Sequence, residues 1–293
     1  MLMVPVVSLG NTGLKVSKLG FGTVDFGVPL NLRPEEGGQI LAESNRLGVN
    51  FWDTSDDYGT HPHVASALKL VPRNEVVIST KTSAKSGKEA RRSLKSSLKE
   101  LDTDYIDIFL LHYVKSDWIN GCHQVLKELN DLKTAGIVKA IGLSTHSVTV
   151  AREASQFEEA DVIMTICCKA SQAMINRFPE HIPLEDGSIE EMFNAIKLAH
   201  KNGKGVIAMK VLGGRVRGPA PPLVKNYQSS IKSIARLDFV DAMVIGMRSL
   251  DEVKRNVNVI RSSLTTTRSH AEKFKQVVQR AGFEPANPYG KGS

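Results

Sequence analysis

Eight short β-rich runs alternate with eight amphipathic helical patterns along the 293 residues of this chain. The β-rich runs cover residues 16–23, 49–55, 75–81, 106–112, 138–145, 160–167, 204–211 and 241–247. Helical patterns follow them at residues 34–48, 61–71, 88–101, 123–136, 148–157, 189–203, 221–236 and 249–262. Strands that are separated by a helix pair in parallel, because the helix carries the chain back to the edge where the previous strand began.

Two α/β architectures can hold such units: an open, doubly wound sheet and a closed barrel. A doubly wound sheet normally carries a glycine fingerprint after its first strand, and the segment GFGTVDFG at residues 20–27 lacks the required spacing. Eight units in fewer than 300 residues fit a closed barrel better. We therefore predict a (β/α)8 TIM barrel that forms a single domain over residues 1–293, since no low-complexity run marks a linker.

Composition narrows the functional classes. The start MLMVPVVSLG lacks the layout of a signal peptide, and apolar runs such as IDIFLL are too short to span a bilayer. The three cysteines (Cys122, Cys167 and Cys168) have no metal-type spacing, so we expect a reducing cytoplasmic setting and no metal site. The net charge is +7, but the lysines and arginines are scattered along the chain. This distribution argues against a nucleic-acid partner.

Ionisable side chains gather at three consecutive strand ends. Asp53 follows the second predicted strand, Tyr58 lies in the next loop, Lys81 ends the third strand and His112 ends the fourth. Active sites of (β/α)8 barrels lie at the carboxyl ends of the strands. Alternation along IDIFLLH places His112 on one face with Ile106, Ile108 and Leu110, and that face would line the barrel. Singly, these groups have structural alternatives, as a turn cap, a solvated rim lysine or a core histidine. Their joint occurrence favours an active site.

The same segments carry a family resemblance. FWDTSDDYG, VVISTK and IFLLH resemble the Asp, Tyr, Lys and His tetrad of the aldo-keto reductases. VSLGNTGLKVSKLGFGT resembles the family's N-terminal hairpin and first strand, and IGLSTHS, VIAMKVLGG and VIGMRSLDEVKRNV resemble its fifth, seventh and eighth strand ends. STHS and AMKVLGG are most similar to a bacterial and archaeal branch that often appends an iron–sulfur domain, but the chain lacks the cysteines for a cluster. The resemblance implies an N-terminal β-hairpin, a C-terminal tail and reduction of an aldehyde or ketone with NADP(H).

The tetrad has a chemical rationale within that resemblance. A carbonyl that accepts hydride develops negative charge on oxygen and needs a proton, which Tyr58 would donate as general acid. An unperturbed phenol has a pKa of about 10, and the Lys81 ammonium would stabilise the phenolate and ease proton release. Asp53 would hold Lys81 in place, and His112 would direct an N–H at the carbonyl oxygen.

The resemblance also implies cofactor contacts spread over several strand ends. On the nicotinamide side we expect Gly22, Thr23 and Asp53, with Ser144 bonding the carboxamide and Thr145 as a further donor. Met164 stands where many relatives have a carboxamide-binding glutamine, and Met209 followed by Lys210 stands where many have a stacking aromatic; both methionines have barrel filling as an alternative. Leu212 and Gly213 would flank the pyrophosphate. Around the adenosine phosphate we expect Gly246, Met247, Arg248, Ser249, Glu252 and Asn256, with helix-start N–H groups helping.

Arg248 decides the predicted cofactor. A guanidinium suits the 2′-phosphate dianion well, and Ser249 and Asn256 can add donors. Glu252 would repel the phosphate, so we predict a modest preference for NADP(H) over NAD(H). The alternative is that Ser249 is only a helix cap and Arg248 a solvated rim residue.

Substrate contacts are less strongly indicated. Candidate walls are Val24, Asp25, Phe26, Tyr113 and Trp118, although loop aromatics also pack simply to seal a barrel rim. Residues 168–188 are long for a connection, which is typical of a functional or mobile segment, and residues 213–223 and 269–293 are candidates for covering the pocket. We interpret His61, His63 and His146 as surface or capping groups, and Cys167 and Cys168 as a buried thiol pair without a role.

Two other functions use the same residues. One is a catalytically weak barrel that keeps the cofactor as a sensor or regulatory subunit. The other is a Schiff-base aldolase or lyase that uses Lys81.

Overall fold

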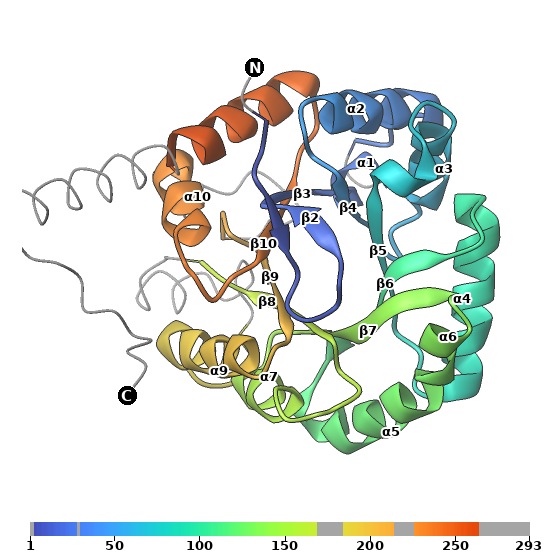
Figure 1. The fold of residues 1–293 in the computed structure, drawn as a ribbon, viewed down its shortest axis with the longest axis vertical. Helices are drawn as coiled ribbons and strands as arrows, with labels where there is room; N and C mark the ends of the chain where they lie inside the picture. Colours follow the sequence, from blue (N-terminus) through green and yellow to red (C-terminus); the bar gives the residue numbers. More distant parts are fainter. Residues whose placement is uncertain (1–2, 28–29, 169–183, 214–225, 264–293) are drawn as a thin grey trace, which may run out of the picture.

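Eight parallel strands close into a barrel in the computed structural model, which describes residues 3–27, 30–168, 184–213 and 226–263 (Figure 1). Their order around the barrel is β10-β3-β4-β5-β6-β7-β8-β9. Each predicted β-rich run overlaps one barrel strand, so the predicted (β/α)8 architecture is confirmed. The strands are β3 (Leu19–Gly22), β4 (Phe51–Asp53), β5 (Val77–Thr82), β6 (Ile106–Val114), β7 (Val138–Thr145), β8 (Val162–Ile166), β9 (Gly205–Met209) and β10 (Ala242–Gly246).

Helices surround the barrel on its outside (Figure 1). They are α1 (Val24–Gly27), α2 (Pro34–Arg46), α3 (His61–Leu68), α4 (Gly87–Leu101), α5 (Ile119–Leu129), α6 (Asp131–Thr134), α7 (Val148–Ala154), α9 (Ile189–Lys201) and α10 (Tyr227–Ala235), with 3-10 turns η1 (Arg73–Glu75) and η2 (Ser116–Trp118). Residues 250–263 form a further helix after β10. Among the helices of the described ranges, none is both long and apolar enough to cross a membrane.

An antiparallel hairpin closes one end of the barrel, as predicted. It pairs β1 (Val6–Ser8) with β2 (Lys15–Ser17). Its turn donates hydrogen bonds from Gly10 N to Asp241 Oδ2 over 3.1 Å and from Asn11 N to Gly203 O over 2.8 Å. Both acceptors lie just before a barrel strand, so the hairpin covers the amino ends of the strands. The predicted C-terminal tail lies outside the described residues.

Strand alternation separates an inner from an outer core. The inner cluster holds Phe51, Val77, Ile108, Leu110, Ala140, Val162, Met164, Ile207 and Ala242, together with hairpin residues. The outer cluster packs the other strand face against the helices and includes Phe21, Trp52, Phe109 and Ile141. Ile106, predicted to share the inner face, packs in the outer cluster instead, as does its β7 partner Val138, and both residues lie at the amino ends of their strands. At the carboxyl ends, the residues in phase with the inner cluster include Asp53, Lys81 and His112.

Candidate active site

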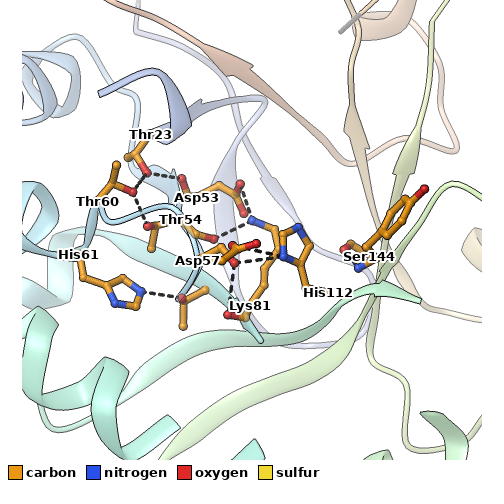
Figure 2. Close-up of polar contacts among 12 residues, drawn as sticks. Thr23, Asp53, Thr54, Asp57, Thr60, His61, Lys81, His112 and Ser144 are labelled. Atoms are coloured by element: carbon orange, nitrogen blue, oxygen red, sulfur yellow. Dashed lines mark hydrogen bonds and ion pairs between the residues drawn. The ribbon is translucent and has the colours of Figure 1, made fainter. Parts of the chain in front are cut away.

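The four tetrad candidates converge at the carboxyl ends of β4, β5 and β6. Asp53 is the last residue of β4, and Lys81 and His112 lie near the ends of β5 and β6. Tyr58 comes from the loop between β4 and α3. Figure 2 shows Asp53, Lys81 and His112 pointing toward one another from their separate strands. The predicted convergence of these side chains is therefore present.

Lys81 is a fully buried ammonium held by two oxygens. Its Nζ donates to Asp53 Oδ2 over 2.8 Å and to the carbonyl oxygen of Thr54 over 2.6 Å, and its side chain is about 2% exposed. Burial opposes the charge, but the carboxylate of Asp53 and its neighbours outweigh burial and raise the pKa of Lys81. The lysine therefore stays cationic at neutral pH. The other carboxylate oxygen of Asp53, Oδ1, is buried and has no hydrogen-bond partner among the described residues.

Tyr58 lies beside this ammonium. The Nζ of Lys81 is 5.0 Å from the centroid of the Tyr58 ring. Burial raises the pKa of Tyr58; Lys81 lowers it, and Asp53 and Asp57 raise it further. The lysine thus eases ionisation of the phenol as predicted, but it does not bring the pKa below its ordinary value. The hydroxyl keeps its proton at neutral pH, which is the state a proton donor needs.

His112 is held by two residues that the sequence did not single out. Its Nδ1 lies 3.2 Å from Ser55 Oγ and 3.4 Å from Asp57 Oδ1. Its ring meets the Tyr58 ring edge-on, with centroids 5.6 Å apart. The hydrogen bond with His112 lowers the pKa of Asp57 to about 2, against burial and with help from Ser55. Because Nδ1 is occupied, the opposite ring nitrogen is the one that can face a ligand. Ser55 and Asp57 lie within the segment TSDDYG, close to Tyr58 in the sequence. That proximity is the signal that could have identified them.

A bulge in β6 accompanies this arrangement. The pairing of β6 with β7 shifts register between Leu111 and Val114, and Tyr113 has a positive φ of 53°. Bulges at barrel rims redirect side chains, and left-handed backbone at a residue other than glycine is uncommon. Tyr113 N donates to Ser144 Oγ over 3.0 Å, which connects the bulge to the end of β7.

Three threonines fix the loop that carries Tyr58. Thr60 Oγ1 lies 2.8 Å from both Thr23 Oγ1 and Thr54 Oγ1, and Thr23 Oγ1 donates to the carbonyl oxygen of Asp53 over 3.0 Å (Figure 2). The hydroxyl of Thr23, predicted to contact cofactor, is fully buried in this network. The hydroxyl therefore supports the loop that carries Tyr58, and a contact of Thr23 with the cofactor stays a prediction.

The three other histidines near the site are buried, so their interpretation as surface groups is wrong. His61 bridges Glu100 Oε2 and Thr80 Oγ1 at 2.8 and 2.9 Å through its two ring nitrogens. His63 Nε2 lies 2.9 Å from the carbonyl oxygen of Leu32. His146 is 8% exposed and packs edge-on against Tyr113. The imidazoles of His61 and His63 thus bond to polar groups that an apolar side chain would leave unpaired.

Alternation sorts the remaining cofactor candidates. Gly22, Ser144 and Gly246 are in phase with the inner face, and Gly22 is the direct partner of both Asp53 and Gly246 in the sheet. A Cβ on Gly22 would lie only 3.0 Å from Cγ1 of Val244, so the absence of a side chain at Gly22 leaves room for the neighbouring valine. Lys210 follows β9 with a φ of 54°, and burial lowers its pKa. Of its neighbours, Leu212 packs on the outer core, and Gly213 has a φ of 90°.

Three predicted cofactor residues have buried side chains. Thr145 is fully buried, and its hydroxyl donates to the carbonyl oxygen of Val114 over 2.7 Å. Met247 is fully buried in the outer core. Each follows a residue in phase with the inner face, so its own side chain points outward. Met164 is 1% exposed within the inner cluster, which makes it barrel filling, whereas Met209 only partly packs on that cluster.

The start of the helix at residues 250–263 is capped by its own side chains. Ser249 Oγ accepts from Glu252 N over 3.3 Å, and Glu252 Oε2 accepts from Arg248 N over 2.9 Å. Ser249 is therefore a helix cap, the alternative considered from the sequence. Asn256, further along the helix, is 6% exposed. Arg248 is not a solvated rim residue, because its Nε donates to Asp25 Oδ2 over 3.1 Å.

The candidate substrate walls are dispersed. Phe26 is fully buried against Phe21 in the outer core, so its prediction as a pocket wall is wrong. Asp25 faces Arg248 instead of a pocket. Val24 is 41% exposed, and Tyr113 and Trp118 are half-buried, with the Nζ of Lys85 3.9 Å from the Trp118 ring centroid. Cys167 and Cys168 are fully buried, as predicted. Most of residues 168–188 and 213–223, and all of 269–293, lie outside the described residues.

Comparisons with known proteins agree with this geometry. The model of the aldo/keto reductase family matches residues 18–219. L-galactose dehydrogenase of Arabidopsis thaliana is 26% identical, with 89% of each chain covered. The NADH-specific methylglyoxal reductase of Escherichia coli is 25% identical over 88% of this chain and 94% of its own.

A solved structure shows the same likeness in three dimensions. A Pseudomonas aeruginosa protein described as an aldo-keto reductase superposes with a TM-score of 0.72 and 27% identity, over 88% of this chain and 96% of its own. The family match covers more than half of the chain and includes the strands that bear Asp53, Lys81 and His112. The chain belongs to the aldo/keto reductase family of oxidoreductases, whose general activity is carbonyl reduction with a nicotinamide cofactor.

Proposed function

We propose that this protein reduces an aldehyde or ketone to an alcohol with NADP(H), and that Tyr58 is the general acid. The observation that carries the proposal is the Tyr58 phenol beside the buried Lys81–Asp53 pair, with the Nζ of Lys81 5.0 Å from the ring centroid. A protonated phenol beside a fixed cation can release its proton to a developing alkoxide, because the cation stabilises the phenolate that remains.

Each tetrad residue has a distinct duty in this proposal. The hydroxyl of Tyr58 donates its proton to the carbonyl oxygen as that oxygen gains charge. Lys81 stabilises the phenolate, and Asp53 keeps Lys81 charged and in place. His112, anchored through Nδ1 by Ser55 and Asp57, uses its other ring nitrogen to orient the carbonyl oxygen.

The residues present fit a nicotinamide dinucleotide. Asp53 Oδ1 is a buried acceptor that no described residue satisfies, and such an atom suits a ligand hydroxyl or amide. Glycines at Gly22 and Gly246 let a ligand approach the strand ends closely. Ser144 can donate its hydroxyl proton, since its oxygen already accepts from Tyr113 N. When bound, the cofactor would supply hydride.

The phosphate end of the cofactor would lie at the start of the helix at residues 250–263. In (β/α)8 barrels, the loops after the last two strands and a helix N-terminus often bind phosphate. Arg248, two residues before this helix, supplies positive charge there. We propose NADP(H) over NAD(H) because of Arg248, with the margin reduced by Glu252, whose carboxylate lies at the same helix start.

The substrate class proposed is a small polar carbonyl compound. Two relatives carry names that specify L-galactose and methylglyoxal, both of which are small and polar. A Schiff-base lyase is disfavoured, because Lys81 is buried, bonded to two oxygens and kept cationic, and a cationic amine is not a nucleophile.

Reduction of an activated aromatic aldehyde by the purified protein tests the proposal. Wild type should oxidise NADPH. Tyr58→Phe should reduce the aldehyde ~10²–10⁴-fold more slowly while still binding NADPH, because only the hydroxyl is removed. Cofactor binding without turnover by wild type would favour the sensor or regulatory role. Near-normal turnover by Tyr58→Phe would show that the acid is another group, and borohydride trapping of a carbonyl compound on Lys81 would favour the lyase.

A further inference from the structure

Arg248 is paired with a carboxylate that comes from the opposite end of the chain. Barrel closure makes Gly22 of β3 and Gly246 of β10 direct partners in the sheet. Asp25 stands three residues after Gly22, and Arg248 two residues after Gly246. Asp25 Oδ2 accepts from Arg248 Nε over 3.1 Å, and the two side chains are 14% and 31% exposed.

Local packing favours this pair. A Cβ on Gly246 would lie 3.2 Å from Asp25 Oδ2, so the absence of a side chain at Gly246 leaves room for the carboxylate. Glu252 Oε2 accepts from the backbone N–H of the same arginine. Arg248 therefore has one carboxylate at its guanidinium and a second at its backbone N–H, and both negative charges disfavour a dianion bound nearby.

We propose that Asp25 is a specificity-determining residue that restrains Arg248 and thereby limits the preference of this protein for NADP(H) over NAD(H). The inference rests on the proposed function, which gives the 2′-phosphate to Arg248. It assigns to Asp25 a role different from the pocket wall expected from the sequence.

The effect follows from competition for one guanidinium. A 2′-phosphate must share Arg248 with Asp25 or displace it, and it must also approach the Asp25 carboxylate, which repels it. A cofactor with a 2′-hydroxyl gains little from Arg248 and meets no such repulsion. Asp25 therefore weakens NADPH binding selectively.

Fluorescence titration of NADPH and NADH against the full chain tests this inference. Asp25→Asn keeps the size of the side chain and removes its charge, so NADPH should bind about three- to tenfold more tightly while the affinity for NADH changes by less than about twofold. In the Arg248→Ala background, Asp25→Asn should change the ratio of the two affinities clearly less than in the wild-type background, since the restrained group is gone and only the direct repulsion by Asp25 remains. Calorimetry with ADP-ribose and its 2′-phosphate should give the same contrast without any nicotinamide.

Asp251→Asn is the matched control. Asp251 is an exposed carboxylate near the start of the same helix, and none of the hydrogen bonds of Arg248 among the described residues involves it. Its loss should change the affinity ratio by less than about twofold. Asp25→Ser serves as a second variant if Asp25→Asn does not fold. An unchanged ratio in the Asp25 variants, or an equal change in the Arg248→Ala background, would overturn the inference. Failure of wild type to bind either dinucleotide would instead overturn the proposed function.

Discussion

Two carboxylates at the end of β4 and in the loop after it serve different side chains. Asp53 holds the Lys81 ammonium at 2.8 Å in a buried pair, whereas Asp57 lies 3.4 Å from the His112 ring with half of its side chain exposed. The buried pair fixes charge beside the phenol, because neither partner can be neutralised without leaving the other uncompensated. The exposed pair orients an imidazole. Residues four apart thus support the two sides of the candidate site.

Lys81 and Asp53 are predicted to act as one unit. Lys81→Met should lower kcat/KM by roughly 10²-fold or more. Burial raises the pKa of Tyr58, and without Lys81 no cation lowers it again. Asp53→Asn should lower kcat/KM less. The double variant should be little worse than Lys81→Met alone, since both changes act on one proton transfer. Steady-state kinetics on the three variants measures this, and fully additive losses would contradict a shared role.

Asp57 is predicted to stabilise the fold in a pH-dependent manner. Its pKa in the folded protein is about 2, below the ordinary 3.8, so its contribution is present above pH 3.8 and is lost as the pH falls through about 2. The advantage of wild type over Asp57→Asn in free energy of unfolding should therefore shrink between about pH 6 and about pH 3. Urea unfolding at both pH values measures it. Asp56→Asn is the control, because Asp56 accepts from Ser93 instead of His112. A constant or growing advantage would show that His112 does not hold Asp57 as described.

At the scale of elements, local backbone conformation decides where helices end. The helical patterns at residues 34–48 and 123–136 end in Gly48 and Gly136, which have φ values of 92° and 72°. Helix α4 ends at Leu101 and is followed by Asp102, which adopts the same left-handed conformation with φ 53° and ψ 54°. Asp102 N donates to the carbonyl oxygens of Leu98 and Lys99, so the turn is formed without the residue that fits it best.

Asp102→Gly is predicted to stabilise the protein by about 0.5–1 kcal/mol, because glycine adopts the left-handed conformation without steric cost. Asp102 is exposed, so little packing is lost. The reverse change, Gly136→Ala, is the control and should destabilise by about 1 kcal/mol, although nothing lies within 4 Å of the added Cβ. Denaturant unfolding of both variants measures the two effects. A destabilised Asp102→Gly would show that the aspartate side chain contributes more than its backbone costs.

At the scale of the whole molecule, barrel closure joins the two ends of the chain. β3 pairs with both β4 and β10, so the first and last barrel strands are neighbours. The hairpin turn bonds to Asp241 and Gly203, which strengthens the same junction. No barrel edge is left to pair on its own. We propose on this basis that residues 1–293 fold as a single domain.

A single domain is predicted to unfold in one cooperative transition. Trp52 is fully buried on β4. This strand pairs with β3, which in turn pairs with the last barrel strand, β10. The fluorescence of Trp52 in a Trp118→Phe variant should change at the same denaturant concentration as the far-ultraviolet ellipticity, which reports all helices. Two separate midpoints would contradict the single domain and indicate that one half of the barrel unfolds first.

The sequence by itself determined the kind and order of elements, because hydrophobic period and punctuating glycines are local properties. It also indicated the candidate site, since Asp53, Lys81 and His112 stand at strand ends that a parallel barrel must bring together. Only the tertiary structure decided which neighbour faces inward, as with Ser144 over Thr145 and Gly246 over Met247. It alone brought Asp25 to Arg248, because contacts between residues far apart in the chain exist only after the barrel closes.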